Sequence, residues 1–379
     1  MRLVALTAAF AFACSSKPAD PPPHVASGSA VIAADARVDD PNAVLATKLA
    51  AIRADKKLPA VAAALWTRGK LLAIAAVGDR KQGDAAHTVT VDDRWHLGSN
   101  TKAMTALVIA RHVERGTLHW TDTLDKLFPG TKLDPAYRRV TLAQLLQHTG
   151  GMPANPPDDA WQKLWADGTS PDARSTFVRA ALREKPEQAP GTFVYSNTGY
   201  IVAGTALERA TGQRWEDLMK RELFEPLGMT SCGFGAPGKN SDVDQPWGHA
   251  PDGSPVAPGH PQADNPPGLG PAGTVHCSLA DYGKFLAVVL AGARGDPQPL
   301  LKPETFTTLL TPVGGTYAGG WIVKSTSYGK VLGHSGSNTM WFATALIFPD
   351  SQVIAVIATN TGDTTLESAL VSLLDGFTK

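Results

Sequence analysis

The residues of this chain best suited to chemistry are a serine and a lysine three positions apart, Ser99 and Lys102. A serine hydroxyl becomes a nucleophile when a nearby base accepts its proton, and a lysine one helical turn away can be that base. Residues 95–102 predict a strand-like approach, a turn at Gly98 and a helix start, where free N–H groups favour negative charge. The alternative is a helix-capping serine followed by a surface lysine, and the pattern alone leaves it open.

A second short motif, Tyr195-x-Asn197, follows a proline-glycine turn. A phenol within reach of Lys102 would be held partly ionised by the ammonium group and would relay protons. The amide of Asn197 offers both a donor and an acceptor for holding a substrate amide. Alone, this motif describes a turn with a packed tyrosine equally well.

A third motif, His334-Ser335-Gly336-Ser337, follows a strand-like stretch over residues 330–333. An edge strand beside the nucleophile would supply a backbone N–H to an oxyanion and a ladder for an extended substrate. Gly336 permits close approach of substrate, and His334 or Ser335 would bind a carboxylate or relay a proton. The alternative is a partly buried, hydrogen-bonded histidine.

These motifs need elements to position them, and apolar runs predict strands toward both ends of the chain. A helix starting at Pro41 and two strands, over residues 59–65 and 71–77, precede the first motif. A helix, several strands between residues 321 and 359, and a last helix form the C-terminal part. The middle is mostly helix and loop, with a Pro- and Gly-rich loop over residues 236–272.

The predicted fold class is α+β, an α/β sandwich in which one mostly antiparallel sheet is flanked by helices. The domain spans residues 41–379. Its sheet part covers about residues 41–98 and 273–379, and a mostly helical insertion covers about residues 99–272. A cleft between the two parts is the expected place for the site.

Composition excludes several classes of function. Lysine plus arginine equals aspartate plus glutamate, 35 each, so no net charge attracts nucleic acid or anionic lipid. The sequence has no basic tract, no glycine-rich phosphate loop and no Cys-x-x-Cys or His-x-x-x-His spacing. We therefore expect no metal, no cofactor and no nucleic-acid partner, and a monomer that acts on a small-molecule or peptide substrate.

The N-terminus predicts export. Residues 1–14 have the form of a signal peptide, with Arg2 before an apolar run that is too short to span a bilayer. A small residue precedes Cys14, as in bacterial lipoprotein processing sites where the cysteine carries lipid. Residues 15–40 are rich in proline and serine and predict a flexible linker. The expected location is the periplasm or cell envelope, with the chain anchored at Cys14 or cleaved near Ala13 and released.

Two further cysteines, Cys232 and Cys277, lie in the predicted domain. In an exported protein they can pair as a disulfide, and they can equally remain as two buried free thiols. The sequence leaves both states open.

The three motifs, in this order, resemble those of the penicillin-recognising serine hydrolases. That family includes class C β-lactamases, D-alanyl-D-alanine carboxypeptidases, D-aminopeptidases and related esterases. Ser-x-x-Lys at Ser99, Tyr-x-Asn at Tyr195 and His-x-Gly at His334 carry the likeness. Supporting segments lie at residues 145–153, 190–191, 226–229, 271–273 and 278–281. The likeness covers about residues 41–379 and implies a β-lactamase/transpeptidase-like fold.

The resemblance also implies a role for each motif residue. It makes Ser99 the acylated nucleophile, Lys102 its base and Tyr195 the proton relay to the leaving group and the deacylating water. The backbone N–H groups of Ser99 and Ser337 would form the oxyanion hole. The substrate-binding residues would be Asn197, His334, Ser335 and Gly336.

The implied activity is that of an exported serine hydrolase that forms an acyl-enzyme on Ser99 and needs no cofactor. The bonds cleaved would be amides or esters of D-alanyl peptides or small esters, as in a D,D-carboxypeptidase, D-aminopeptidase or esterase. The β-lactamases of this branch usually carry lysine where this chain has His334, which counts against efficient β-lactam hydrolysis. The alternatives are a class C-like β-lactamase and a non-catalytic penicillin-binding sensor.

Overall fold

The computed structural model describes residues 40–166, 172–260 and 263–374. The predicted signal peptide with Cys14, and the predicted linker apart from Asp40, lie outside these residues. Within the described ranges, no helix is both long and apolar enough to cross a membrane.

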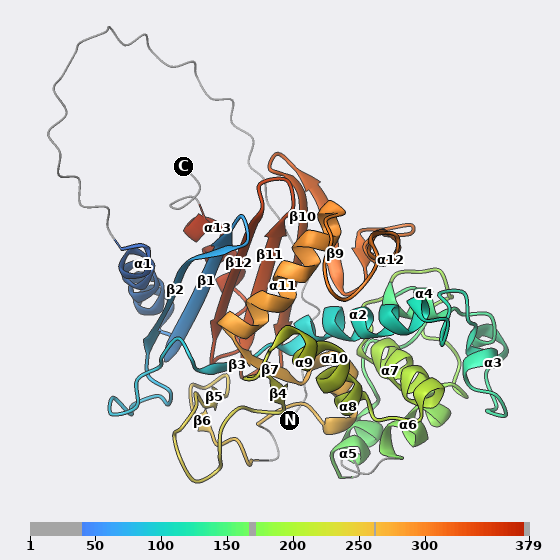
Figure 1. The fold of residues 1–379 in the computed structure, drawn as a ribbon. Helices are drawn as coiled ribbons and strands as arrows, with labels where there is room; N and C mark the ends of the chain where they lie inside the picture. Colours follow the sequence, from blue (N-terminus) through green and yellow to red (C-terminus); the bar gives the residue numbers. More distant parts are fainter. Residues whose placement is uncertain (1–39, 167–171, 261–262, 375–379) are drawn as a thin grey trace, which may run out of the picture.

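A seven-stranded antiparallel sheet organises the molecule, and both ends of the chain build it (Figure 1). The two ends meet where the first and last strands pair, with Val61 opposite Thr359. This arrangement confirms the predicted α+β class. In spatial order the strands are β2 (Lys70–Gly78), β1 (Ala60–Thr67), β12 (Val353–Thr359), β11 (Phe342–Phe348), β10 (Gly329–Ser337), β9 (Trp321–Thr326) and β8 (Tyr317–Ala318).

Helices cover both faces of this sheet. The helices α1 (Pro41–Lys56) and α13 (Leu366–Leu374) cover one face, and α11 (Leu279–Arg294) crosses the other (Figure 1). Alternate residues of β1 enter the two separate cores, Val61 on the α1 side and Ala62 on the α11 side. Because both faces are covered, the central strands are apolar almost throughout.

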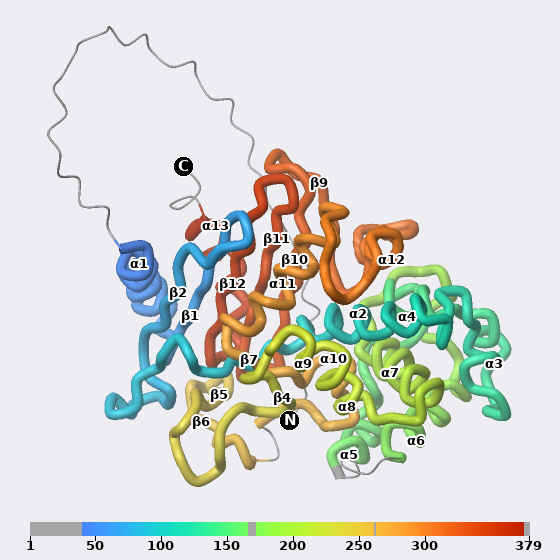
Figure 2. The backbone as a smooth tube through the Cα atoms, in the orientation of Figure 1, coloured from blue at the N-terminus to red at the C-terminus, as the bar shows by residue number. Residues whose placement is uncertain are grey.

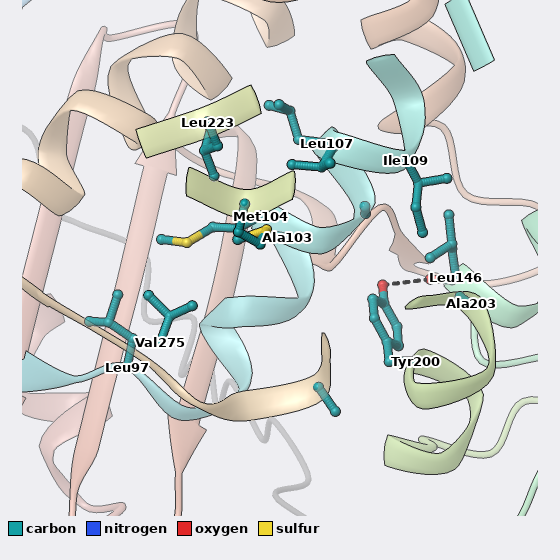
Figure 3. Close-up of a cluster of buried hydrophobic side chains, with 14 of the residues drawn as sticks. Leu97, Ala103, Met104, Leu107, Ile109, Leu146, Tyr200, Ala203, Leu223 and Val275 are labelled. Atoms are coloured by element: carbon teal, nitrogen blue, oxygen red, sulfur yellow. Dashed lines mark hydrogen bonds between the residues drawn. The ribbon is translucent and has the colours of Figure 1, made fainter. Parts of the chain in front are cut away.

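The helical region lies beside the sheet, as the tube view shows (Figure 2). Its central helix is α2 (Thr101–Glu114), which is buried on every side from Thr101 to Ala110. Figure 3 shows Met104, Leu107 and Ile109 of α2 in this core. It also shows Tyr200 beside Leu146, whose carbonyl accepts the Tyr200 hydroxyl at 3.0 Å. The other helices are α3 (Leu124–Leu127), η2 (Pro135–Tyr137), α4 (Leu142–Leu146), α5 (Asp158–Ala166), α6 (Ala173–Ala181), α7 (Asn197–Thr211), α8 (Trp215–Met219), η3 (Lys220–Phe224), α9 (Glu225–Leu227), η4 (Pro267–Leu269), α10 (Gly270–Gly273) and α12 (Pro303–Leu309).

The strand that leads into Ser99 belongs to a second, smaller sheet. This strand, β3 (Arg94–His96), pairs with β7 (Val275–Ser278), which also pairs with β4 (Gly233–Phe234). A disulfide between Cys232 and Cys277 ties this sheet together and decides the pairing that the sequence left open. A two-stranded ribbon, β5 (Gly248–His249) with β6 (Pro255–Val256), lies in the long Pro- and Gly-rich loop.

Candidate active site

Ser99 lies in a single 3₁₀ turn, η1 (Gly98–Asn100), between β3 and α2. Gly98 has φ of +51°, a conformation that glycine adopts without steric cost. Asn100 is fully buried; its amide donates to the carbonyls of Leu97 (2.8 Å) and Ala343 (3.1 Å). Ser99 itself keeps partial exposure between these buried neighbours. The turn therefore presents the hydroxyl to solvent on a rigid base.

Lys102 lies under Ser99 and is fully buried. Its Nζ is 2.9 Å from Ser99 Oγ, 2.7 Å from Asn197 Oδ1 and 2.7 Å from the Ala272 carbonyl oxygen. The amide and carbonyl oxygens can only accept, so they take two amine protons, while the serine hydroxyl can also donate. A neutral amine in this position therefore aims its lone pair at Ser99 Oγ.

Burial lowers the pKa of Lys102 well below its ordinary value, because the charged ammonium is the form that desolvation disfavours. The three polar atoms around Nζ belong to a hydroxyl, an amide and a carbonyl, none of which is an anion. The site thus stabilises the deprotonated amine, the form that can accept the proton of Ser99.

Tyr195 and Asn197 flank the start of α7, which Ser196 caps by accepting the backbone N–H of Gly199 at 2.8 Å. Tyr195 hydrogen-bonds Ser99, yet burial raises the pKa of its phenol. The expected partial ionisation of this phenol is therefore wrong, because burial favours the neutral forms of both Tyr195 and Lys102. The structure places a neutral phenol beside the serine.

Asn197 is held from two sides. Its Oδ1 accepts from Lys102, and its Nδ2 donates to Asn155 Oδ1 at 2.6 Å. The amide orientation follows from these two partners, because a lysine amine donates to oxygen. In this structure the oxygen of the amide that was expected to hold substrate orients Lys102.

His334, on β10, is buried and uses both ring nitrogens. Its Nδ1 is 2.7 Å from the Ser335 carbonyl oxygen, which only accepts, so the ring proton is on Nδ1. Nε2 then accepts the Tyr317 hydroxyl at 3.0 Å. Burial, assisted by the charge of Lys102, lowers the pKa of His334 to about 3. A neutral ring with both nitrogens occupied offers no positive charge to a substrate carboxylate.

The structure brings Ser335 to a different place from the other motif residues. Side chains alternate along β10, so Ser335 points to the sheet face opposite His334. Its Oγ donates to Thr344 Oγ1 at 2.8 Å and lies 3.3 Å from Glu367 of α13. The side chain therefore contacts the α13 side of the sheet, away from the group around Lys102.

Gly336 and Gly98 allow the strand and the serine turn to touch. A Cβ on Gly336 would lie 2.4 Å from Ser99 N, and one on Gly98 would lie 2.4 Å from Ser337 N. Pairing of β10 with β9 ends at Gly333, whereas pairing with β11 continues to Ser337. The free edge of β10 beyond Gly333 therefore runs against the serine turn, and the two predicted oxyanion donors are close together.

Two aromatic residues at the site were not assigned a role from the sequence. The His148 ring lies 4.3 Å from Tyr195 and 4.4 Å from Tyr317, centroid to centroid. Its Nδ1 accepts the backbone N–H of Ser196 at 3.0 Å, so it links the Tyr195 loop to the neighbouring rings. His148 was visible only as part of a family-like segment, and Tyr317 lies in a glycine-rich stretch without any motif.

The end of the predicted site loop passes beneath the nucleophile. Besides the Ala272 carbonyl that accepts from Lys102, the Pro271 carbonyl accepts from Thr105 Oγ1 at 2.8 Å. Both donors belong to α2, so this loop fixes the helix that carries the lysine. Among the residues that the structure describes, no cluster of three His, Cys, Asp or Glu side chains forms a potential metal site.

A strand edge, a serine turn and a buried lysine arranged in this way characterise the β-lactamase-like serine hydrolases. The chain belongs to this family: the model described as Beta-lactamase matches residues 45–372. It is accordingly a serine hydrolase.

Individual relatives agree with this assignment. Penicillin-binding protein 4 of Amycolatopsis lactamdurans is 27% identical over 328 residues, which cover 82% of this chain and 83% of that protein. A putative D-alanyl-D-alanine carboxypeptidase of Escherichia coli is 28% identical over 38% of this chain and 35% of its own length. The octameric penicillin-binding protein homologue of Pyrococcus abyssi shares the fold with a TM-score of 0.70, at 24% identity, over 90% of this chain and 78% of that one.

Proposed function

We propose that this protein hydrolyses amide or ester bonds of D-alanyl peptides or small esters through an acyl-enzyme on Ser99. The observation that carries the proposal is the buried Lys102 amine, 2.9 Å from Ser99 Oγ and with a lowered pKa. A structural lysine would gain nothing from this desolvation, whereas a base that works near neutral pH requires it.

In the proposed reaction, Ser99 Oγ attacks the carbonyl carbon as its proton passes to Lys102 Nζ. The oxygen of the tetrahedral intermediate accepts from the backbone N–H groups of Ser99 and Ser337. The neutral Tyr195 hydroxyl donates its proton to the leaving group and recovers one from Lys102. Water then attacks the acyl-enzyme by the same path in reverse and releases the acid.

The neutral His334 bears on the preferred substrate. Lys102, His334 and His148 are basic side chains of the site, and burial holds all three toward their uncharged forms. None of them then offers a cation to a substrate carboxylate. We therefore infer that leaving groups without a carboxylate are preferred, as in a D-alanyl amide or a short ester. The name of the Escherichia coli relative supports the alternative, a peptide that ends in D-alanine.

The test compares purified protein with its Ser99→Ala variant. Substrates are a p-nitrophenyl acetate ester, D-alanyl p-nitroanilide, a D-alanyl-D-alanine peptide and nitrocefin, and fluorescent penicillin serves as a covalent probe. We expect turnover of the ester and the anilide at least tenfold faster than of the peptide, and none by Ser99→Ala. If Ser99→Ala were as active as wild type, the assignment of Ser99 as the nucleophile would be refuted.

The other outcomes separate the alternatives. Rapid nitrocefin turnover would favour a β-lactamase, and fast release of the peptide's terminal D-alanine would favour a carboxypeptidase. Stable labelling by fluorescent penicillin without turnover of any substrate would favour a sensor.

We also propose that the chain acts outside the cytoplasm, on the strength of the signal-like residues 1–14. Mass spectrometry of the mature N-terminus, purified from a bacterial host, tests this. A start at Cys14 with an added diacylglycerol mass supports anchoring, and a start after residue 13 without it supports secretion. An intact Met1 contradicts export.

A further inference from the structure

A buried histidine adjoins the serine turn from behind. His96, the last residue of β3, is fully buried, and its Nδ1 accepts the backbone N–H of Gly98 at 3.1 Å. Since Nδ1 accepts, the ring proton is on Nε2. That nitrogen lies in close contact with Asp264 Oδ1, at 2.6 Å, although its N–H is not aligned for a hydrogen bond. The imidazole therefore connects the turn that carries Ser99 to a carboxylate on a distant loop.

The same carboxylate reaches the other side of the site. Asp264 Oδ1, which contacts His96, accepts a hydrogen bond from Asn338 Nδ2 at 3.1 Å. Asn338 is buried, directly follows Ser337, and is itself fixed because its Oδ1 accepts the Met340 N–H at 3.2 Å. Asp264 thus joins the segment before Ser99 to the segment after Ser337.

We propose that the bridge His96–Asp264–Asn338 sets the spacing of the two oxyanion donors, Ser99 N–H and Ser337 N–H. The inference rests on the proposed function, and all three are positioning residues, since none touches the reacting atoms. Oxyanion donors act only when both lie about 2.7–3.1 Å from the developing oxygen, and displacements near 1 Å cost about a hundredfold in rate. The serine turn and β10 belong to different parts of the fold, so a direct side-chain link between them resists such displacement.

The test compares an oxoester with the matching thionoester in wild type, Asp264→Asn and Asn338→Ala. The C=S sulfur is larger and a weaker acceptor than oxygen, so the oxo/thiono ratio of kcat/KM reports how well the donors fit the oxyanion. We expect Asp264→Asn to lower kcat/KM for the oxoester about tenfold or more and to lower the ratio at least fivefold. The double variant Asp264→Asn/Asn338→Ala should have nearly the same ratio as Asp264→Asn alone, because both changes break the same bridge.

The matched control is Asp93→Asn, which removes a carboxylate that is 1% exposed, against 9% for Asp264, and that pairs with Arg80 at 2.6 Å. It tests loss of a buried charge as such, and we expect the ratio to stay within twofold of wild type. If Asp264→Asn left the ratio unchanged, or if Asp93→Asn lowered it equally, the bridge would be overturned. A merely structural defect lowers both rates together and leaves the ratio intact.

A second measurement does not depend on activity. The Nε2 proton of His96 facing Asp264 should give a downfield ¹H NMR resonance, absent from His96→Gln and shifted upfield in Asp264→Asn. Its absence from the wild-type spectrum would overturn the bridge even if no ester were hydrolysed. If wild type is active and Asp264→Asn leaves the oxo/thiono ratio unchanged, the bridge alone is overturned. If wild type is inactive on all substrates, the proposed function is overturned.

Discussion

Lys102 combines complete burial with contact to Ser99, the one residue of the turn Gly98–Asn100 that is partly exposed. Burial destabilises the ammonium, and the two obligate acceptors at Nζ, on Asn197 and Ala272, leave the lone pair for the serine. In the proposed mechanism, activation of Ser99 thus depends on a desolvated amine and does not require a phenolate. Tyr195 is correspondingly free to act as a proton donor.

The first prediction concerns the pH dependence of kcat/KM. The protonated amine cannot accept the serine proton, so activity is lost as pH falls through the pKa of Lys102 in the folded protein. Because burial lowers that pKa, the midpoint of the acid limb should lie well below about 10.4, the value for free lysine. Stopped-flow acylation by p-nitrophenyl acetate from pH 5 to 10 measures it. A midpoint at or above 10 would contradict a desolvated base.

His334 shows what a sequence motif can and cannot predict at this scale. The residues around it predicted the strand correctly, whereas the contact of Gly336 with the serine turn was not predicted. Its charge and partners could not be predicted, because they depend on Tyr317, seventeen positions away, and on burial by a complete fold. Ser335 lies away from the other motif residues for a simpler reason: side chains alternate along a strand, so its side chain must lie on the face opposite His334.

At the scale of elements, the site depends on two backbones in contact. The edge of β10 meets the serine turn only because Gly336 and Gly98 lack side chains. Asp264, on a loop whose sequence has no hydrophobic periodicity, then connects the serine turn to the end of β10. The sequence predicted the strands and the helix from apolar spacing, but a contact between a loop carboxylate and a strand 74 residues later has no local signal.

The second prediction follows from this contact. A methyl group at Gly336 would lie 2.2 Å from the Leu97 carbonyl oxygen and 2.4 Å from Ser99 N, so the strand must move away. We expect Gly336→Ala to lower kcat/KM at least a hundredfold, because the Ser337 N–H leaves the oxyanion. The control is Gly315→Ala, where a Cβ meets nothing within 4 Å. Equal activity of both variants in the ester assay would rule out a tight contact.

At the scale of the whole molecule, the site lies where the sheet and the helical region meet, and one continuous core cluster spans both. The sheet supplies β10, and the helical region supplies Lys102 and Asn197. The predicted α+β class and the pairing of the two chain ends follow from strand-like runs near both termini. The small sheet of β3, β7 and β4 did not follow, because strands of two to four residues are too short for a periodicity signal.

The last prediction is that mild acid destabilises the whole fold through its buried histidines. Burial lowers the pKa of His276 to about 4, against an ordinary value of about 6.5. Between these values the unfolded chain binds a proton that the folded chain excludes, so stability falls as pH falls. Between pH 7 and pH 5 this one residue should remove about 2 kcal/mol of unfolding free energy.

Urea unfolding at pH 7 and pH 5 measures this loss. His276→Asn keeps a donor for the Gly235 carbonyl, which Nδ1 of His276 contacts at 2.8 Å, but cannot titrate. We expect this variant to lose about 2 kcal/mol less than wild type over that pH range. His119→Asn, at an exposed histidine, should lose as much as wild type. Identical losses of unfolding free energy in all three proteins would contradict the prediction. They would mean that His276 is protonated in the folded protein, because the small sheet opens to water while the main sheet stays folded.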